Sequence, residues 1–320
     1  MGQKKKVHSK IKGDLHPRNK HRERYDFKAL TADCPELAPF VSLNKFKNES
    51  INFADPAAVL MLNKAILKHF YAVDWSIPKG FLCPPVPGRA DYIHYVADLL
   101  ATVNGGSIPT TEKVKCLDIG VGANCIYPII GHQEYTWSFV GADIEPAALS
   151  SASKIVEDNP SLKKGIELRL QANAYDFFKG IIKEDEHYDV TICNPPFHSS
   201  LEEATEGSLR KLSSLNKKEV KELVLNFGGN AKELYCNGGE ERFVSNMIKQ
   251  SKMFADSCLW FTTLVSKQDN LRTFRKLLKG LGAAEVKMIP MAQGTKISRV
   301  IAWTFKNEAQ QQAWADRYWK

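Results

Sequence analysis

The spacing of apolar residues changes character about a third of the way along the chain. Between residues 51 and 110 apolar side chains recur at every third or fourth position, the period of helices buried on one side. Asp55 and Pro56 make a helix start, and Asn104-Gly105-Gly106 ends the second helix. The pattern therefore predicts a helical subdomain over 51–110. The apolar positions of the first helix are Val59, Leu60, Leu62, Ile66, Leu67 and Phe70, and those of the second are Ile93, Val96, Leu99 and Leu100.

After Thr111 short apolar runs alternate with helix-like segments, which is typical of a mainly parallel sheet. Only Met291–Lys296 separates the last two runs, too little for a crossover helix, so we expect a hairpin and one antiparallel strand. This α/β layout is similar to the Rossmann-like class I S-adenosylmethionine-dependent methyltransferase fold. We assign it to residues 111–306, with a C-terminal tail at 307–320. The seven predicted strands are 113–119, 136–143, 166–171, 187–193, 258–265, 284–290 and 297–305.

Composition shows that the chain folds, and charge suggests what it binds. Of 320 residues 43% are hydrophobic and 25% charged, enough apolar material for a large core and too much for a chain that is disordered throughout. The net charge is +8, and the first 24 residues hold nine Lys or Arg against two acids, which accounts for seven of the eight charges. A charge confined to one end is typical of an arm that binds a polyanion, nucleic acid first of all, although a solvated tail is the simpler alternative.

This basic arm is the first part of an extension that we place at residues 1–50. It is polar and has almost nothing to bury, so we expect it to be mobile until it binds RNA. For Lys296 and Arg299, near the final hairpin, a solvated hairpin tip is an equal alternative to RNA binding. The other residues expected to contact RNA lie in the arm: Lys4, Lys5, Lys6, Lys10, Lys12, Arg18, Lys20, Arg22 and Arg24.

Cysteine usage and hydropathy limit the setting of the protein. The seven cysteines are scattered, odd in number and without a Cys-x-x-Cys pair, so we expect neither a disulfide framework nor a metal site. The longest apolar stretches are interrupted by charged residues, and no apolar signal segment follows Met1. We therefore expect a cytoplasmic protein with no membrane partner and no evident obligate protein partner.

The first chemical motif is the run Cys116–Asn124, in which an apolar strand leads into a glycine-bearing turn before a helix. Gly120 and Gly122 let the backbone approach a ligand at the carboxyl end of the strand, and Asp118 precedes them. Cys125 stands where a dinucleotide fingerprint has its third glycine, which argues against a pyrophosphate-bearing cofactor and is compatible with S-adenosylmethionine.

Three more positions are candidates for binding this cofactor. Asp143 closes the second strand, where a carboxylate can accept hydrogen bonds from both ribose hydroxyls; the alternative is that it caps the helix near Pro146. Asn173 follows the third strand and can contact an adenine edge, or it is an ordinary turn residue. The prolines of Cys83–Arg89 predict a rigid, non-helical loop that presents Arg89 to the cofactor carboxylate; a surface Arg without a partner is the alternative.

The most specific signal is Asn194-Pro195-Pro196-Phe197, directly after a buried strand. The prolines hold an extended backbone, so the Asn side chain and nearby carbonyls must point out of the sheet edge. Acceptors on both N–H groups of a purine amine favour the pyramidal geometry that frees its lone pair for attack on a methyl group. Phe197 can stack on the base, and a proline turn with an exposed Phe is the alternative.

Together with its flanks, this tetrapeptide resembles the ribosomal RNA large-subunit methyltransferase F family. The supporting segments are 86–94, 118–128 and 293–299, and the resemblance spans nearly the whole chain. It implies N6-methylation of one adenine in 23S rRNA; eukaryotic relatives methylate adenine in small nuclear RNA and messenger RNA hairpins. It also implies that S-adenosylmethionine is contacted by Arg89, Gly120, Asn124 and Asp143, and that the target adenine is held by Asn194 to Phe197.

Between the tetrapeptide and Gly239 lies a long polar insertion, at about 198–239, which we interpret as a substrate lid. The expected partner is 23S rRNA or a large-subunit assembly intermediate that presents an unstacked adenine. Three readings compete with this one. They are methylation of guanine N2 or of a protein glutamine by the same kind of loop, RNA binding without catalysis, and ribosome assembly in which methylation is incidental.

Overall fold

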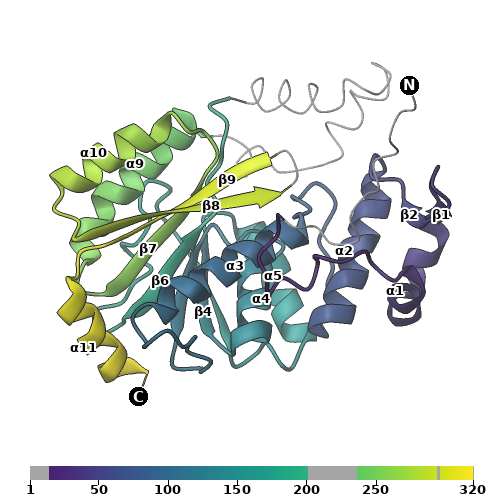
Figure 1. Cartoon of the computed structure of the whole chain (residues 1–320), viewed down its shortest axis with the longest axis horizontal. Helices are drawn as coiled ribbons and strands as arrows, with labels where there is room; N and C mark the ends of the chain where they lie inside the picture. Colours follow the sequence, from purple (N-terminus) through teal and green to yellow (C-terminus); the bar gives the residue numbers. More distant parts are fainter. Residues whose placement is uncertain (1–13, 201–235, 294–295, 320) are drawn as a thin grey trace, which may run out of the picture.

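A seven-stranded sheet forms the centre of the molecule (Figure 1). The computed structural model describes residues 14–200, 236–293 and 296–319. Neighbouring strands follow the order β5-β4-β3-β6-β7-β9-β8, and all pairs are parallel except those of β9, which runs antiparallel to both neighbours. The strands are β3 (Lys115–Ile119), β4 (Ser138–Asp143), β5 (Ile166–Leu170), β6 (Tyr188–Cys193), β7 (Cys258–Val265), β8 (Glu285–Gln293) and β9 (Lys296–Thr304).

All seven predicted strands are present, and the prediction of one antiparallel strand is confirmed. The late hairpin explains that strand: β8 crosses to the outer edge, and β9 returns between β7 and β8. The sheet therefore has the mainly parallel α/β layout that the sequence predicts.

Helices cover both faces of the sheet. One hydrophobic cluster joins the inner faces of α2, α3, α4 and α5 to one side of the sheet, and a second joins α9 and α10 to the other. Because helices on both faces of a sheet cover its central strands, β6 and β7 consist of buried residues throughout. These helices are α2 (Pro56–Tyr71), α3 (Val86–Ala101), α4 (Ile126–Tyr135), α5 (Pro146–Asp158), α9 (Gly239–Ser251) and α10 (Asn270–Gly280).

The N-terminal part packs against α2 at the side of the sheet (Figure 1). The predicted start of α2 is confirmed: the side chain of Asp55 accepts a hydrogen bond from Ala57 N, and Pro56 occupies the first turn. Leu62 of α2 and Ile93 of α3 belong to the same cluster as Val190 of the sheet, so these helices share its core. The domain boundaries at 50, 110 and 306 stay predictions. The remaining N-terminal elements are α1 (Phe27–Asp33), the 3₁₀ helix η1 (Pro35–Phe40), β1 (Val41–Leu43) and β2 (Glu49–Ile51).

The expectation of a non-helical loop over Cys83–Arg89 is wrong in its second half. Helix α3 begins at Val86, so Pro87 and Arg89 lie in its first turn. Proline is tolerated there because the first N–H groups of a helix have no partner within the helix, and its fixed φ already suits the helix. Arg89 is therefore mounted on a helix start rather than on a loop.

The expectation that the basic arm is mobile as far as Arg24 is wrong for its described part, residues 14–24. Leu15, His16, Asn19 and His21 are all buried. The buried carboxylate of Asp91 accepts hydrogen bonds from the backbone N–H of His16 (3.0 Å) and from Asn19 Nδ2 (2.5 Å). Since a buried carboxylate without donors is costly, these contacts hold the segment against α3.

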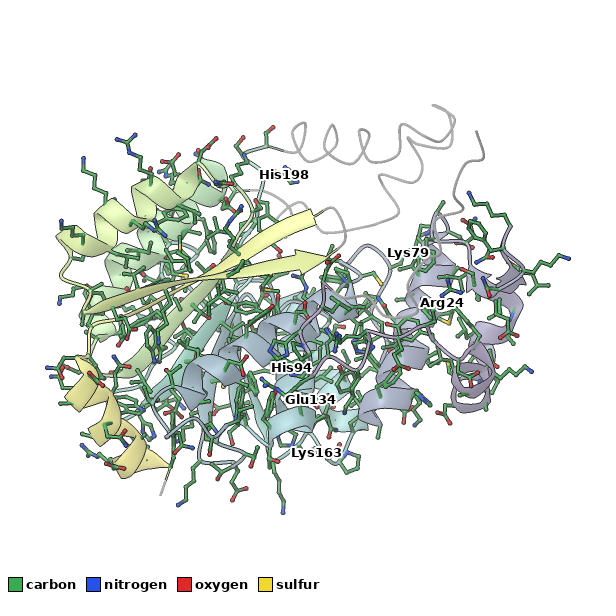
Figure 2. All side chains as sticks on the ribbon, viewed as in Figure 1. Arg24, Lys79, His94, Glu134, Lys163 and His198 are labelled. Carbon is green, nitrogen blue, oxygen red and sulfur yellow. The ribbon has the colours of Figure 1, made fainter. Side chains whose placement is uncertain are left out.

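Two basic residues of the arm are engaged by the protein itself. Arg18 donates to Asp98 (2.8 Å), to the carbonyl of His94 (3.0 Å) and to the hydroxyl of Tyr135 (3.1 Å). Lys20 pairs with Glu134 (2.9 Å), which is labelled with His94 in Figure 2. These two cations therefore dock the segment, a use that the sequence prediction missed.

The segment predicted as a C-terminal tail is helix α11 (Glu308–Tyr318), which packs on the sheet. Asn307 and Gln310 form a capping box at its start, and Trp314 is buried. The indole N–H of Trp314 donates to Asp189 (2.6 Å) in β6, whose other oxygen accepts from Lys115 N (2.7 Å). Burial raises the pKa of Asp189 from its usual value to about 6. Helix α11 is therefore anchored to the sheet.

Within the described residues, no helix combines the length and the apolar character that crossing a bilayer requires.

Asp189 gives a testable pH dependence. Its folded-state pKa of about 6 lies above the unfolded value of 3.8, so the folded protein binds this proton more tightly. The stabilisation of the fold by this proton is complete below about pH 4. About 3 kcal/mol of it is lost as the pH rises through 6. In urea unfolding at pH 4 to 7, the free energy of unfolding of the wild type, relative to Asp189→Asn, should fall across this window. The exposed Asp269→Asn is the control, and a difference independent of pH would contradict the assignment.

Candidate active site

A cavity of about 410 Å³ lies at the carboxyl ends of the parallel strands. Gly120 of the turn after β3, Asp143 at the end of β4, and Asn194 and Pro196 after β6 all line it. Because parallel strands present their carboxyl ends at the same edge, loops that are distant in sequence converge here. The structure thus places the glycine turn and the Asn-Pro-Pro-Phe loop in one pocket.

Backbone conformation shapes the glycine turn. Gly120 (φ 78°), Gly122 (φ 63°) and Cys125 (φ 51°) all have positive φ, and a Cβ on Gly120 would meet no atom within 4 Å. Gly141 of β4 has the opposite constraint, since a Cβ there would lie 2.8 Å from the side chain of Val121. The turn can therefore lie against β4 while Gly120 leaves its side of the cavity open.

The carboxylate of Asp143 connects the turn to the wall of the cavity. One oxygen accepts from Gly122 N (2.9 Å) and the other from Glu145 N (2.9 Å), and burial raises its pKa. It thus holds Glu145, the N-cap residue of α5, without itself capping the helix, and it also lines the pocket. Each oxygen keeps a second lone pair for a hydroxyl group, so its role as ribose acceptor stays a prediction.

Asp118 is fully buried on β3 and does not line the cavity. Neither of its oxygens has a hydrogen-bond partner within the described part of the chain. Burial, with a smaller contribution from the charge of Asp143, raises its pKa well above the usual value. A role of Asp118 in cofactor binding stays a prediction.

The Asn-Pro-Pro-Phe loop rests on a buried polar network. Thr263 of β7 donates to the carbonyl of Cys193 (3.3 Å), and the N–H of Cys193 donates to the hydroxyl of Tyr92 (3.4 Å). Pro195 is buried, whereas Phe197 is half-buried against the main core and does not line the cavity. Stacking of Phe197 on a base stays a prediction.

Arg89 reaches this loop from the start of α3. Its Nη1 donates to Asn194 Oδ1 (3.2 Å) and to the hydroxyl of Tyr127 (3.0 Å), and its guanidinium lies 5.5 Å from the centre of the Tyr127 ring. Arg89 does not line the cavity described above. It is therefore half-buried, with partners on two elements, rather than an unpaired surface Arg.

Two of the predicted cofactor ligands make hydrogen bonds within the protein. Asn173 accepts from Tyr175 N (3.1 Å) and donates to Asp176 (2.8 Å), which is the turn alternative, and its side chain is exposed. Asn124 accepts from Ile126 N (3.2 Å) and donates to the carbonyl of Leu82 (3.4 Å). Neither residue lines the cavity, and cofactor binding by Asn124 and Asn173 stays a prediction.

Sequence reasoning missed part of the wall. Asp176 and Phe177, just beyond Asn173, line the cavity, as does Phe243 of α9, whose ring meets that of Phe177 edge-on at 4.8 Å. Gln250 of α9 fixes this loop by donating to the carbonyl of Tyr175 (2.7 Å) and accepting from Phe177 N (3.0 Å). The acidic and aromatic residues that follow β5 in the sequence could have indicated Asp176 and Phe177. No neighbouring residue in the sequence indicates that Phe243 lines the cavity.

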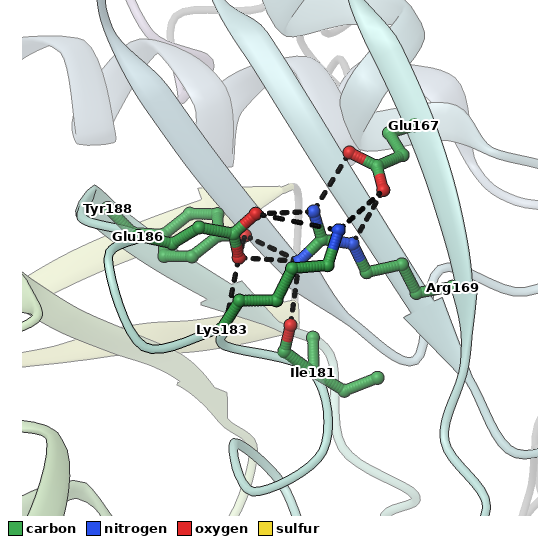
Figure 3. Close-up of polar contacts among 6 residues, drawn as sticks. All are labelled: Glu167, Arg169, Ile181, Lys183, Glu186 and Tyr188. Carbon is green, nitrogen blue, oxygen red and sulfur yellow. Dashed lines mark hydrogen bonds and ion pairs between the residues drawn. The ribbon is translucent and has the colours of Figure 1, made fainter.

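The base of the same loop is tied to the edge strand β5 (Figure 3). Both Nη atoms of Arg169 donate to Glu186 (2.6 Å each), and Nη1 also donates to the carbonyl of Ile181 (2.7 Å). These hydrogen bonds hold the pKa of Glu186 at about 2. A bidentate pair of this kind holds residues 171–187 against the sheet, so the cavity wall has a fixed base.

Most of the predicted insertion, residues 201–235, lies outside the described residues. Its two ends meet beside the cavity, where Cys236 N donates to the carbonyl of His198 (3.1 Å), a residue labelled in Figure 2. Cys236 also lines the cavity. The insertion therefore begins and ends at the candidate site, and its role as a lid stays a prediction.

The candidate RNA-binding residues are only partly described. Arg24 is exposed, and Arg299 donates to Gln268 (3.0 Å). Arg22 donates to the carbonyl of Pro17 (3.3 Å). The remaining candidates lie outside the part of the chain whose side chains the structure describes: Lys4, Lys5, Lys6, Lys10, Lys12 and Lys296.

Comparison with known proteins identifies the family of the chain. A family model described as RNA methyltransferase matches residues 9–307. The chain is 57% identical over 317 residues to "Ribosomal RNA large subunit methyltransferase F" of Cytophaga hutchinsonii, covering 99% of this chain and 98% of that protein. The protein of the same name from Marinomonas sp. is 54% identical over 310 residues, covering 96% and 95%.

Solved structures of human METTL16 are similar as well. The catalytic domain in complex with MAT2A 3'UTR hairpin 1 has a TM-score of 0.76 and 28% identity, covering 92% of this chain and 96% of that one. The N-terminal domain in complex with SAH has a TM-score of 0.72 and 27% identity, covering 92% and 99%.

The fold and the site define an S-adenosylmethionine-dependent methyltransferase. Within that class, the chain belongs to the ribosomal RNA large subunit methyltransferase F family.

The residues present fit S-adenosylmethionine. The cavity falls in the size range of small-molecule sites, about 300–1,000 Å³. The acceptor oxygens of Asp143 border it, and the open side of Gly120 admits close approach.

Replacing Asp143 tests the assigned wall. In Asp143→Ala, the affinity for S-adenosylhomocysteine, measured by calorimetry, should fall at least about tenfold, because the two ribose hydroxyl groups of the ligand lose a charged acceptor. Asp158→Asn, at the exposed end of α5, should leave it unchanged. An affinity within twofold of the wild type in a variant that melts normally would show that Asp143 serves only the turn and the helix start.

Proposed function

We propose that the protein methylates the N6 amine of one adenine in 23S ribosomal RNA, with S-adenosylmethionine as donor. The observation that carries this proposal is that Asn194 and Pro196 line the same cavity as Gly120 and Asp143. A base held by the loop and a cofactor held by the turn would therefore meet within one pocket. The names of the relatives support ribosomal RNA as substrate, and the METTL16 complex with an RNA hairpin supports a folded RNA.

The loop is suited to an amine that is conjugated to a purine ring. The lone pair of such an amine is delocalised, which makes it a poor nucleophile. Asn194 Oδ1 and a loop carbonyl would accept hydrogen bonds from its two N–H groups and favour the pyramidal form, in which the lone pair is available. Rigid mounting by Pro195 and Pro196 removes the need to reorganise these acceptors. When bound, S-adenosylmethionine supplies an electrophilic methyl group on a sulfonium sulfur.

An amine in a stacked, paired adenine cannot reach this pocket, so the substrate must present an unstacked base. Phe197, at the end of the loop, would stack on it. Basic residues outside the pocket would bind phosphates and add affinity with little sequence discrimination. The substrate would be 23S rRNA or a large-subunit assembly intermediate, in the cytoplasm where such particles form.

Asn194→Ala tests the acceptor role. Methyl transfer to 23S rRNA from cells lacking the protein should fall by at least about 10²-fold, because the variant loses an acceptor that acts on the reacting amine. Affinity for S-adenosylhomocysteine should stay within about threefold of the wild type, since the other cofactor contacts remain. A variant with wild-type turnover would remove the proposed role of this residue.

Mass spectrometry of the product nucleosides separates the acceptors that similar loops serve. N6-methyladenosine in rRNA treated with the wild-type protein is expected, and it should be absent from rRNA of cells lacking the protein. N2-methylguanosine instead, or methylated glutamine in a ribosomal protein, would replace the proposed acceptor while keeping the enzyme class.

Deleting residues 1–13 tests the basic arm without disturbing the packed segment after it. RNA binding at low salt should weaken by about tenfold or more, and the slope of log affinity against log salt should fall by up to about 3.5, because five lysines are lost. Affinity for S-adenosylhomocysteine is the internal control. Unchanged RNA affinity and slope would assign phosphate binding to other parts of the protein.

A further inference from the structure

The contact between Arg89 and Asn194 joins the two halves of the site. Arg89 comes from the first turn of α3, whereas Asn194 follows β6, and their hydrogen bond measures 3.2 Å. The resemblance to the family implies a cofactor contact for Arg89 and an adenine contact for Asn194, but it does not imply a contact between them.

The chemistry of the pair determines how the Asn194 amide is oriented. A guanidinium only donates hydrogen bonds, so the amide must turn its oxygen, and not its NH₂ group, toward Arg89. An amide oxygen accepts two hydrogen bonds, and Arg89 takes one, so the second lone pair is left for a substrate amine. Without Arg89, the two ends of the amide could exchange places, and in one orientation Asn194 would present a donor to another donor.

The guanidinium has a second edge. Nη1 donates both to Asn194 Oδ1 and to Tyr127, which uses its two hydrogens. Among the described residues, Nε and Nη2 of Arg89 donate to no group, and this edge can take a carboxylate in bidentate geometry. One side chain can therefore hold the amide and a carboxylate at once.

We propose that Arg89 is a positioning residue for methyl transfer: it fixes the orientation of the Asn194 amide through Nη1, while Nε and Nη2 hold the carboxylate of S-adenosylmethionine. This inference rests on the proposed function and deepens it. Cofactor binding and base positioning are then linked through a single planar cation.

Arg89→Lys separates the two tasks. Lysine keeps a charge for the carboxylate but is a point donor that cannot serve both edges. Affinity for S-adenosylhomocysteine should stay within about threefold, while kcat at saturating cofactor should fall at least about 30-fold. In Arg89→Met both tasks are lost, so this affinity should also fall at least about tenfold. Arg275→Lys, on the exposed side of α10, is the matched control.

A readout independent of catalysis follows the amide itself. In protein labelled with ¹⁵N at asparagine side chains, the Asn194 signals, assigned by their loss in Asn194→Ala, should shift in Arg89→Lys and not in Arg275→Lys. Tyr127→Phe, which removes only the other Nη1 partner, is a milder variant and should lower kcat by about threefold with unchanged S-adenosylhomocysteine affinity.

Either of two results would overturn the proposal. One is wild-type kcat in Arg89→Lys. The other is a loss of activity that saturating cofactor restores, together with unshifted Asn194 signals, which would leave Arg89 as a cofactor ligand alone. Failure of the proposed function is distinguishable, because wild-type protein would then leave the rRNA adenine unmethylated while the Asn194 signals still responded to Arg89→Lys.

Discussion

The common direction of β3, β4 and β6 is the constraint on which the rest of this structure depends. Parallel strands deliver whatever follows them to the same edge, so the turn at Gly120, the carboxylate of Asp143 and the amide of Asn194 meet in one cavity. None of these groups would form a site alone. The helices on both faces exclude water from the strands, which keeps the strands in register.

Buried polar groups explain much of the detail around that edge. Asp143 is half-buried and Asp91 is buried, and both accept hydrogen bonds from segments that would otherwise be free to move, namely the glycine turn and the chain around His16. Asp118 is buried without such donors, beneath the turn where the cofactor is expected. The hydrogen bonds to Asp143 and Asp91 thus stabilise the glycine turn and the segment that docks on α3.

The same need explains why part of the charge pattern misled the sequence analysis. Arg18 and Lys20 belong to a basic run that is typical of an RNA-binding arm, yet they bond to Asp98 and Glu134, which lie far away in the sequence. Asn173 was chosen because it follows a strand, but the local turn uses its side chain, and Asp176 reaches the cavity instead. A residue type suggests what a side chain can bind, whereas its partner depends on what the fold brings near.

Local patterns in the sequence determined the strands, the start of α2, the glycine turn and the Asn-Pro-Pro-Phe loop, because each depends on hydrophobic period or on the backbone limits of glycine and proline within a few residues. The tertiary structure decided which of these residues share a cavity and that Phe243 joins them. It also decided that Arg89 holds Asn194, and that the segments near both ends of the chain are packed. Such contacts join positions up to more than a hundred residues apart, and only a completed sheet brings them together.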